Sequence, residues 1–361
     1  MSDYIVSARK YRPQTFDQVV GQEAIVTTLE HALASNKLAQ ALLFCGPRGV
    51  GKTTCARILA RTINETDNPN DDNDFAFNIF ELDAASNNSV DDIRNLIDQV
   101  RFPPQVGNYK VFVIDEVHML STSAFNAFLK TLEEPPAHAI FILATTEKHK
   151  ILPTILSRCQ IYDFKSIGIP DIKNHLEKIA KKEGVTYEDD ALHLIAQKAD
   201  GALRDALSIF DRLVTFGEGS LTLEGVADTL NVLDYDTYFA ITDACLENKI
   251  PEALHIFDKI LRKGYDAQLF ISGLGGHFRD LLVSQHPQTI ELLDVGEKTK
   301  VKYIEQGKKC TPQFLMDALD ICNQADINYR ASKNQRLTVE IALMQIGSLT
   351  QQGQPKKKSI A

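Results

Sequence analysis

The sequence lacks any apolar run of the roughly 18–20 residues that a membrane-spanning helix needs. One of its longest apolar runs covers only residues 139–144 and is typical of a buried strand. The first 13 residues carry Asp3, Arg9, Lys10 and Arg12 and none of the apolar stretch found in secretory signals. These absences predict a cytoplasmic protein without membrane contact.

The sequence also lacks an excess of positive charge and any closely spaced cysteine pair. Its 39 Lys and Arg against 48 Asp and Glu give a formal net charge of −9, which excludes a basic coat for nucleic acid but not a local basic groove. The six cysteines are Cys45, Cys55, Cys159, Cys245, Cys310 and Cys322. Without a C-x-x-C pair they support neither a zinc module nor a disulfide framework, and we expect reduced, mostly buried thiols.

What is present is the composition of an ordinary globular protein, 44% apolar and 24% charged, in 361 residues. That length suits two or three domains. In the first half, amphipathic stretches alternate with short apolar runs at 41–45, 80–83, 111–115 and 140–145. The alternation predicts a parallel α/β sheet with right-handed crossovers. Residues 64–74 (NETDNPNDDND) are acidic and rich in Asn, and we expect a solvated loop there.

Beyond residue 164 helical periodicity replaces the strand signal. Helices are predicted from residue 170 to a cap at Gly184, from 189 to about 199, over 203–216, and then around 240–246, 253–261, 269–282, 314–325 and 337–349. The pattern divides the chain into an α/β domain over 1–165, a small helical domain over 166–229 and an all-α domain over 230–350. Residues 351–361 are Lys-rich without an apolar stripe, and are expected to be disordered or to begin a longer linker.

A glycine-rich segment, GPRGVGKT, stands between the predicted strand at 41–45 and a predicted helix over 54–63. Its glycines let the backbone curl so that successive N–H groups face phosphate oxygens. Lys52 would reach the β- and γ-phosphates, and the Thr53 hydroxyl would hold Mg²⁺. The predicted nucleotide-binding set is Gly46, Pro47, Arg48, Gly49, Val50, Gly51, Lys52, Thr53 and Thr54.

Two carboxylates, Asp115 and Glu116, follow the apolar run VFVI. Because parallel strands end at one edge of the sheet, Asp115 is expected beside the glycine-rich loop as a second group for Mg²⁺. Glu116 can orient and deprotonate an attacking water. Two acids after a strand are equally typical of a helix N-terminus, and only their pairing with the loop favours catalysis. His118 is left unassigned, because a lone histidine is more often a packing residue.

Further motifs, in order along the chain, are similar to those of one known family. They are RKYRP (9–13), VVGQ (19–22), GPRGVGKT (46–53), IDEVHML (114–120), LKTLEEPP (129–136), LATTE (143–147), ILSRCQ (155–160) and GALRDALS (201–208). The chain thereby resembles the tau/gamma subunit family of bacterial DNA polymerase III, which drives the sliding-clamp loader. The resemblance extends from about residue 6 to residue 349. It implies an α/β P-loop AAA+ domain with a parallel sheet, a helical lid domain and an all-α collar domain.

The resemblance also implies roles for single residues. Thr145 would act as sensor 1 and read the γ-phosphate, while Arg204 would act as sensor 2 on the phosphates of its own ATP. Arg158 would be an arginine finger that acts in trans on the ATP of a neighbouring subunit. The residues that would surround the adenine are Tyr11, Arg12, Val19 and Val20.

An activity follows from the same resemblance: an ATPase that uses ATP and Mg²⁺ in DNA replication. Its collar would join other clamp-loader subunits in a five-membered ring, and the ring would open a sliding clamp and load it on primer–template DNA. Arg94 and Arg101 either hold DNA phosphates in the ring or belong to a solvated charged face. No polymerase active site is visible.

In two places the chain departs from the family pattern. The family commonly carries a four-cysteine zinc module where this chain has residues 64–77, without cysteine, so zinc is not expected. The chain ends just past the predicted collar, so we expect a short form or a truncated chain without the extension that contacts polymerase core and helicase.

Two alternatives remain. One is another AAA+ DNA-processing ATPase, such as a branch-migration or recombination-associated motor. The other is a non-catalytic scaffold subunit, although Lys52, Thr53, Asp115 and Glu116 are all in place.

Overall fold

A computed structural model describes residues 5–64, 78–105, 107–230 and 233–350. The chain divides into two compact units, Met1–Lys182 with Ile195–Arg212, and Glu183–Leu194 with Leu213–Ala361. Residues 65–77, which hold most of the expected acidic loop and the segment where no zinc module is expected, lie outside the described residues, as does the expected tail at 351–361. The three-domain division of the chain stays a prediction.

A five-stranded parallel sheet organises the first unit. Its strands are β1 (Ala41–Cys45), β2 (Ile79–Asp83), β3 (Lys110–Asp115), β4 (Ala139–Thr145) and β5 (Gln160–Asp163), in the spatial order β2-β3-β4-β1-β5. The parallel α/β sheet and its four predicted strands are confirmed. β5 was not predicted as a strand, because only Tyr162 of its four residues is buried and no apolar run marks it.

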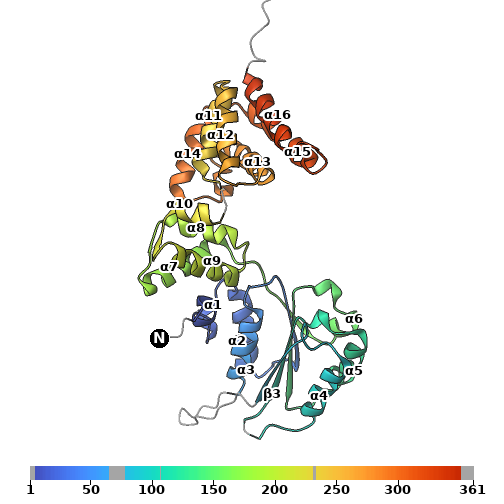
Figure 1. Cartoon of the computed structure of the whole chain (residues 1–361). Helices are drawn as coiled ribbons and strands as arrows, with labels where there is room; N and C mark the ends of the chain where they lie inside the picture. Colours follow the sequence, from blue (N-terminus) through green and yellow to red (C-terminus); the bar gives the residue numbers. More distant parts are fainter. Residues whose placement is uncertain (1–4, 65–77, 106, 231–232, 351–361) are drawn as a thin grey trace, which may run out of the picture. The chain divides into compact units, whose positions relative to one another are not determined.

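Alternate residues of each strand enter two different apolar cores, so helices must cover both faces of the sheet. Leu42 and Phe44 pack towards α2 (Glu23–Ala34) and α3 (Lys52–Thr62). Leu43, with Phe112 of β3 and Phe141 of β4, packs towards α4 (Val90–Val100) and α5 (Thr122–Glu133). Figure 1 shows α2 and α3 on one face and α4, α5 and α6 on the other. Each buried Leu or Phe stabilises the fold by about 1.5–3 kcal/mol.

Local sequence signals set where the covering helices begin. Ser89 accepts a hydrogen bond from the Asp92 amide and Asp92 bonds back to Ser89, a capping box that starts α4. α3 starts at Lys52, two residues earlier than predicted, directly after Gly51. Lys52 and Thr53 therefore lie in the first turn of the helix, where backbone N–H groups have no partner within the helix.

The predicted helices after residue 164 are confirmed as α7 (Ile169–Glu183), α8 (Asp189–Lys198) and α9 (Leu203–Phe216). Gly184 has a φ of +70°, the left-handed conformation expected of a helix-ending glycine. Two short parallel strands, β6 (Thr186–Tyr187) and β7 (Ser220–Leu221), also lie here. The expectation that strands end at residue 164 was wrong, because a two-residue strand leaves no periodicity to read.

The remainder of the second unit is helical. Its helices are α10 (Leu223–Thr229), α11 (Tyr235–Leu246), α12 (Ile250–Arg262), α13 (Ala267–Ser284), α14 (Glu297–Gly307), α15 (Pro312–Tyr329) and α16 (Gln335–Ser348). Helices α11 to α16 share one core, in which Phe257, Phe270 and Phe278 are fully buried. α10 and α14 were not predicted. In the described ranges no helix is long and apolar enough to cross a membrane.

Five of the six cysteines are buried, which confirms that part of the prediction, and Cys159 is half-buried. Burial raises the pKa of the Cys45 thiol to about 11 and that of Cys55 to about 12. Both thiols are therefore protonated at neutral pH and pack as small apolar groups.

Candidate functional site: a phosphate loop and two carboxylates at one sheet edge

The glycine-rich loop leaves β1 and enters α3 through backbone that only glycine adopts without strain. Gly49 and Gly51 have φ values of +76° and +104°. A side chain at Gly49 would also stand 3.0 Å from the Cβ of Ala202. The loop therefore takes the curled form predicted for it, and its N–H groups lead into the N-terminus of α3.

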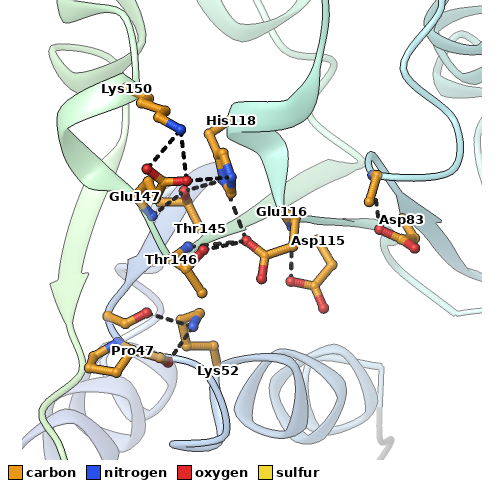
Figure 2. Close-up of polar contacts among 12 residues, drawn as sticks. Pro47, Lys52, Asp83, Asp115, Glu116, His118, Thr145, Thr146, Glu147 and Lys150 are labelled. Atoms are coloured by element: carbon orange, nitrogen blue, oxygen red, sulfur yellow. Dashed lines mark hydrogen bonds and ion pairs between the residues drawn. The ribbon is translucent and has the colours of Figure 1, made fainter. Parts of the chain in front are cut away.

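Lys52 is nearly buried, with 6% of its surface exposed. Its Nζ donates to the backbone carbonyls of Gly46 and Pro47, at 2.7 Å each (Figure 2). Burial lowers the pKa of this ammonium, and the nearby Glu116 and Asp115 carboxylates raise it in opposition. The side chain is thus a desolvated cation folded over the phosphate loop, suited to a phosphate oxygen.

Asp115 ends β3 beside the phosphate loop, as predicted. The Thr53 hydroxyl donates to Asp115 Oδ2 at 2.7 Å, and the Glu116 amide donates to Asp115 Oδ1 at 3.0 Å. A hydroxyl and a carboxylate in contact at a helix N-terminus form the hard oxygen donor set that Mg²⁺ prefers. These residues therefore fit the predicted ion.

Glu116 lies in a left-handed conformation, with a φ of +47°, just after β3. Its Oε2 accepts hydrogen bonds from the Thr146 amide at 3.2 Å and from the Thr146 hydroxyl at 2.9 Å. Such backbone is costly for a residue other than glycine and occurs often at functional sites. The sequence analysis missed Thr146, and only the pairing of β3 with β4 brings it to Glu116.

Thr145 is fully buried at the end of β4. Its Oγ1 lies 3.0 Å from His118 Nδ1 and accepts the Glu147 amide at 3.0 Å. The hydroxyl is thus in hydrogen-bond contact with His118 and Glu147. A sensor role for Thr145 stays a prediction. His118 and Glu147, both missed as site residues, lie beside it (Figure 2).

A cavity of about 340 Å³ opens beside the phosphate loop, within the first unit. It brings together predicted residues that are far apart in sequence: Tyr11, Arg12, Val19, Val20, Arg48, Gly49, Val50, Gly51, Lys52, Thr53, Thr54, Asp115, Glu116 and Arg204. Residues that sequence reasoning missed also line it: Ala8, Pro13, Asp83, Ala85, Ile167, Leu203 and Leu207. The lining combines apolar side chains with charged ones, as an adenine next to a triphosphate requires.

Several cations line the cavity, and two of them, Arg12 and Arg204, are close enough to affect each other. Burial lowers the pKa of Arg12, and the positive charges of Arg57 and Arg204 lower it further. Arg204 belongs to the first turn of α9, and its amide donates to the Gly49 carbonyl at 3.3 Å. α9 therefore places its arginine directly against the phosphate loop, where negative charge on a ligand is favoured.

Arg158 lies outside this cavity, after α6 (Pro153–Leu156). Its Nη2 donates to Glu133 Oε1 at 2.7 Å, and its Nη1 donates to the carbonyl of Thr154. Arg94 and Arg101 are exposed on or next to α4 and pair within their own segment with Asp91 and Asp98. Neither their predicted contact with DNA nor the trans role of Arg158 is tested by these contacts.

Comparison with known proteins supports the sequence resemblance. Residues 21–168 match the model of a family described as DNA polymerase III, delta subunit. Residues 171–219 match the DNA polymerase III clamp loader subunit, ATPase lid domain, and residues 221–360 match DNA polymerase III subunits gamma and tau domain III. The first model has the name of another subunit, whereas relatives aligned over most of the chain are tau and gamma subunits.

The chain is 40% identical over 352 residues to DNA polymerase III subunit tau of Bacillus subtilis, which covers 94% of this chain and 62% of that protein. It is 40% identical over 300 residues to the Escherichia coli tau subunit, covering 80% and 47%. With the gamma subunit of Buchnera aphidicola from Acyrthosiphon pisum the identity is 32% over 367 residues, covering 95% and 99%. The chain thus spans about half to three fifths of these two tau subunits.

The Thermotoga maritima RuvB Holliday junction branch migration motor is similar in structure, with a TM-score of 0.50 and 21% identity, covering 66% of this chain and 80% of that one. At that identity the likeness concerns the fold alone.

Proposed function

The chain belongs to the family of DNA polymerase III tau and gamma clamp-loader subunits, and on that premise we propose that it binds and hydrolyses ATP as a motor subunit of a bacterial sliding-clamp loader. The observation that carries the proposal is one sheet edge, where the phosphate loop, the Thr53–Asp115 pair and Glu116 lie together. Each group matches a requirement of phosphoryl transfer to water.

The residues divide this chemistry among them. The loop amides and Lys52 bind the phosphates, while Tyr11, Val19 and Val20 on the cavity wall pack against the base. Thr53 and Asp115 would hold Mg²⁺, which neutralises phosphate charge when bound. Arg204 stabilises negative charge from the side of α9.

Glu116 is the general base of the proposed reaction. Thr146 occupies its Oε2 with two hydrogen bonds, and the carboxylate also lines the cavity. An anchored carboxylate beside the phosphates can orient a water and take its proton.

The reaction is completed in trans. Arg158 does not line the cavity of its own chain, so we assign it to the ATP of a neighbouring subunit, as the family resemblance implies. Partners would be further clamp-loader subunits in a five-membered ring, the sliding clamp and primer–template DNA.

The test is the ATP hydrolysis rate of the purified chain, alone and with clamp, partner loader subunits and primed DNA. A weak basal rate that rises sharply only with the full set supports a clamp-loader motor completed in trans. A rate indifferent to clamp and partners would contradict it and favour another AAA+ DNA-processing ATPase. No hydrolysis under any condition would favour a scaffold subunit.

A further inference from the structure

His118 is a nearly buried histidine that none of the proposed steps uses. Its side chain is 6% exposed. It lies in the 3₁₀ turn η3 (Val117–Met119), which joins the end of β3 to the segment before α5. Figure 2 shows its ring between Glu116 on one side and the turn that follows β4 on the other.

Both ring nitrogens of His118 face polar groups of the site. Nδ1 lies 3.0 Å from Thr145 Oγ1 and 3.4 Å from Glu116 Oε2. Nε2 lies 3.3 Å from Glu147 Oε1. The two nitrogens of one rigid ring therefore contact both Thr145 and Glu147 and so join the η3 turn to the turn at 145–147, while Nδ1 also lies near the Glu116 carboxylate.

The acceptors around the ring indicate where its hydrogens lie. Hydrogen bonding from Lys150 lowers the pKa of Glu147, so its carboxylate is ionised and offers only lone pairs. The contact with Nε2 is then favourable when Nε2 carries hydrogen. In a ring with one hydrogen, Nδ1 accepts from the Thr145 hydroxyl, whose oxygen still accepts the Glu147 amide.

These contacts close a loop around the proposed general base. Glu116 is bonded to Thr146, Thr146 stands between Thr145 and Glu147 in the chain, and both of these face His118. His118 in turn follows Glu116 by two residues. If the ring is removed, the turn that holds the Glu116 carboxylate loses its support from the β3 side.

We propose that His118 is a positioning residue, which fixes the turn at 145–147 and through Thr146 sets the orientation of the Glu116 carboxylate. The inference rests on the proposed ATPase function. It concerns the hydrolysis step and not nucleotide binding, because His118 does not line the cavity.

Three substitutions separate the two ring nitrogens. His118→Ala removes both contacts. His118→Asn places an amide near the position of Nδ1, towards Thr145 and Glu116, and His118→Gln reaches towards the position of Nε2, towards Glu147. His149→Ala is the matched control, since His149 Nε2 lies 3.5 Å from the same Glu147 carboxylate while its side chain is 76% exposed and makes none of the inward contacts.

Each variant is assembled with wild-type partner subunits, and we measure its ATP dissociation constant, its single-turnover hydrolysis rate and its Tm. We expect His118→Ala to lower the hydrolysis rate about 10- to 100-fold, because a base displaced by an ångström can cost that much. The dissociation constant should change less than about threefold. Asn should recover more of the rate than Gln, and His149→Ala should match the wild type.

Two results would overturn the inference. One is a His118→Ala rate within about twofold of the wild type. The other is an equal loss in Ala, Asn and Gln together with weaker ATP binding and a lower Tm, which would make His118 a packing residue. Absence of hydrolysis in the assembled wild type would instead overturn the proposed function itself.

Discussion

Nη2 of Arg158 donates to Oε1 of Glu133 across 2.7 Å, which joins the turn after α6 to the last residue of α5. The two side chains are 32% and 47% exposed, and a pair so open to water contributes about 0–1 kcal/mol to stability. A guanidinium held this weakly can exchange its partner for a phosphate at small cost. The ion pair, with the hydrogen bond from Nη1 to the Thr154 carbonyl, thus orients Arg158 without sequestering it.

Arg158→Ala should leave ATP binding by the isolated chain nearly unchanged, because the side chain lies outside the cavity. In the assembled loader it should lower the hydrolysis rate steeply, since an arginine supplied in trans contributes about 10³–10⁵ in rate. Equilibrium nucleotide binding and steady-state hydrolysis check the two halves. Glu133→Gln is the control: it breaks the same ion pair but keeps the guanidinium, and it should keep hydrolysis. A large loss of ATP affinity in isolated Arg158→Ala would argue against the trans role.

Lys52→Ala should abolish measurable ATP binding. The substitution removes a buried cation that hydrogen-bonds two loop carbonyls, and with it the charge that meets the phosphates. Calorimetric titration with ATP and Mg²⁺ checks this. Lys181→Ala, which removes a 66% exposed side chain of α7 that forms a salt bridge with Glu177, should bind ATP normally. Unchanged affinity in Lys52→Ala would contradict the assignment of the phosphate site.

Glu116→Gln should preserve ATP binding and slow hydrolysis about 10²–10⁴-fold, the usual contribution of a general base. The amide oxygen can still accept from Thr146, so the local structure should persist. Rapid-quench hydrolysis beside nucleotide titration would separate the two effects. The assignment of Glu116 as the base would be falsified if the variant hydrolysed ATP at the wild-type rate.

His277 makes the second unit sensitive to acid. The residue is 2% exposed; its Nδ1 lies 2.9 Å from the Tyr303 hydroxyl and its Nε2 lies 3.3 Å from Gln306 Oε1. Burial lowers the pKa of this imidazole to about 3 in the folded chain, against about 6.5 when unfolded. The unfolded state therefore binds the proton first, and stability is full above about pH 6.5 and falls as the pH drops towards 3.

The loss of folding stability that this histidine causes on acidification is limited to about 1.4 kcal/mol per pH unit. Urea unfolding followed by circular dichroism between pH 7.5 and pH 5 checks it, with His277→Gln as the comparison. The variant should be less stable at pH 7.5 but lose less stability on acidification. An equal pH slope in both proteins would show that His277 does not titrate on unfolding.

Sequence reasoning reached most of this site because its parts are local. The phosphate loop needs glycines between a strand and a helix, and Asp115 needs only to end a parallel strand. Both features can therefore be predicted from the order of residues along the chain. Thr146 and His118 are different. The contact of Thr146 with Glu116 and the contacts of His118 with Thr145 and Glu147 arise because β3 and β4 are neighbours in the sheet, although the helix α5 separates them in the chain.

The same limit applies to α9 and β5. Helical periodicity predicted α9 over its full length, but nothing in the pattern indicates that Arg204 lies against Gly49. β5 is an edge strand of four residues with one buried side chain. It is recognised as a strand by its pairing with β1 and not by an apolar pattern. Tertiary contacts of this kind depend on chain topology, which residue spacing alone does not determine.

The close approach of Gly49 and Ala202 makes the phosphate loop and the start of α9 neighbours without any intervening side chain. Because glycine and alanine are two of the smallest residues, no long, flexible side chain lies between the two backbones to absorb a displacement of either one. A change in the curvature of the loop would therefore act directly on the start of α9. Because the helix runs unbroken from Leu203 to Phe216, over about 20 Å, a displacement at its first turn would be passed along the helix.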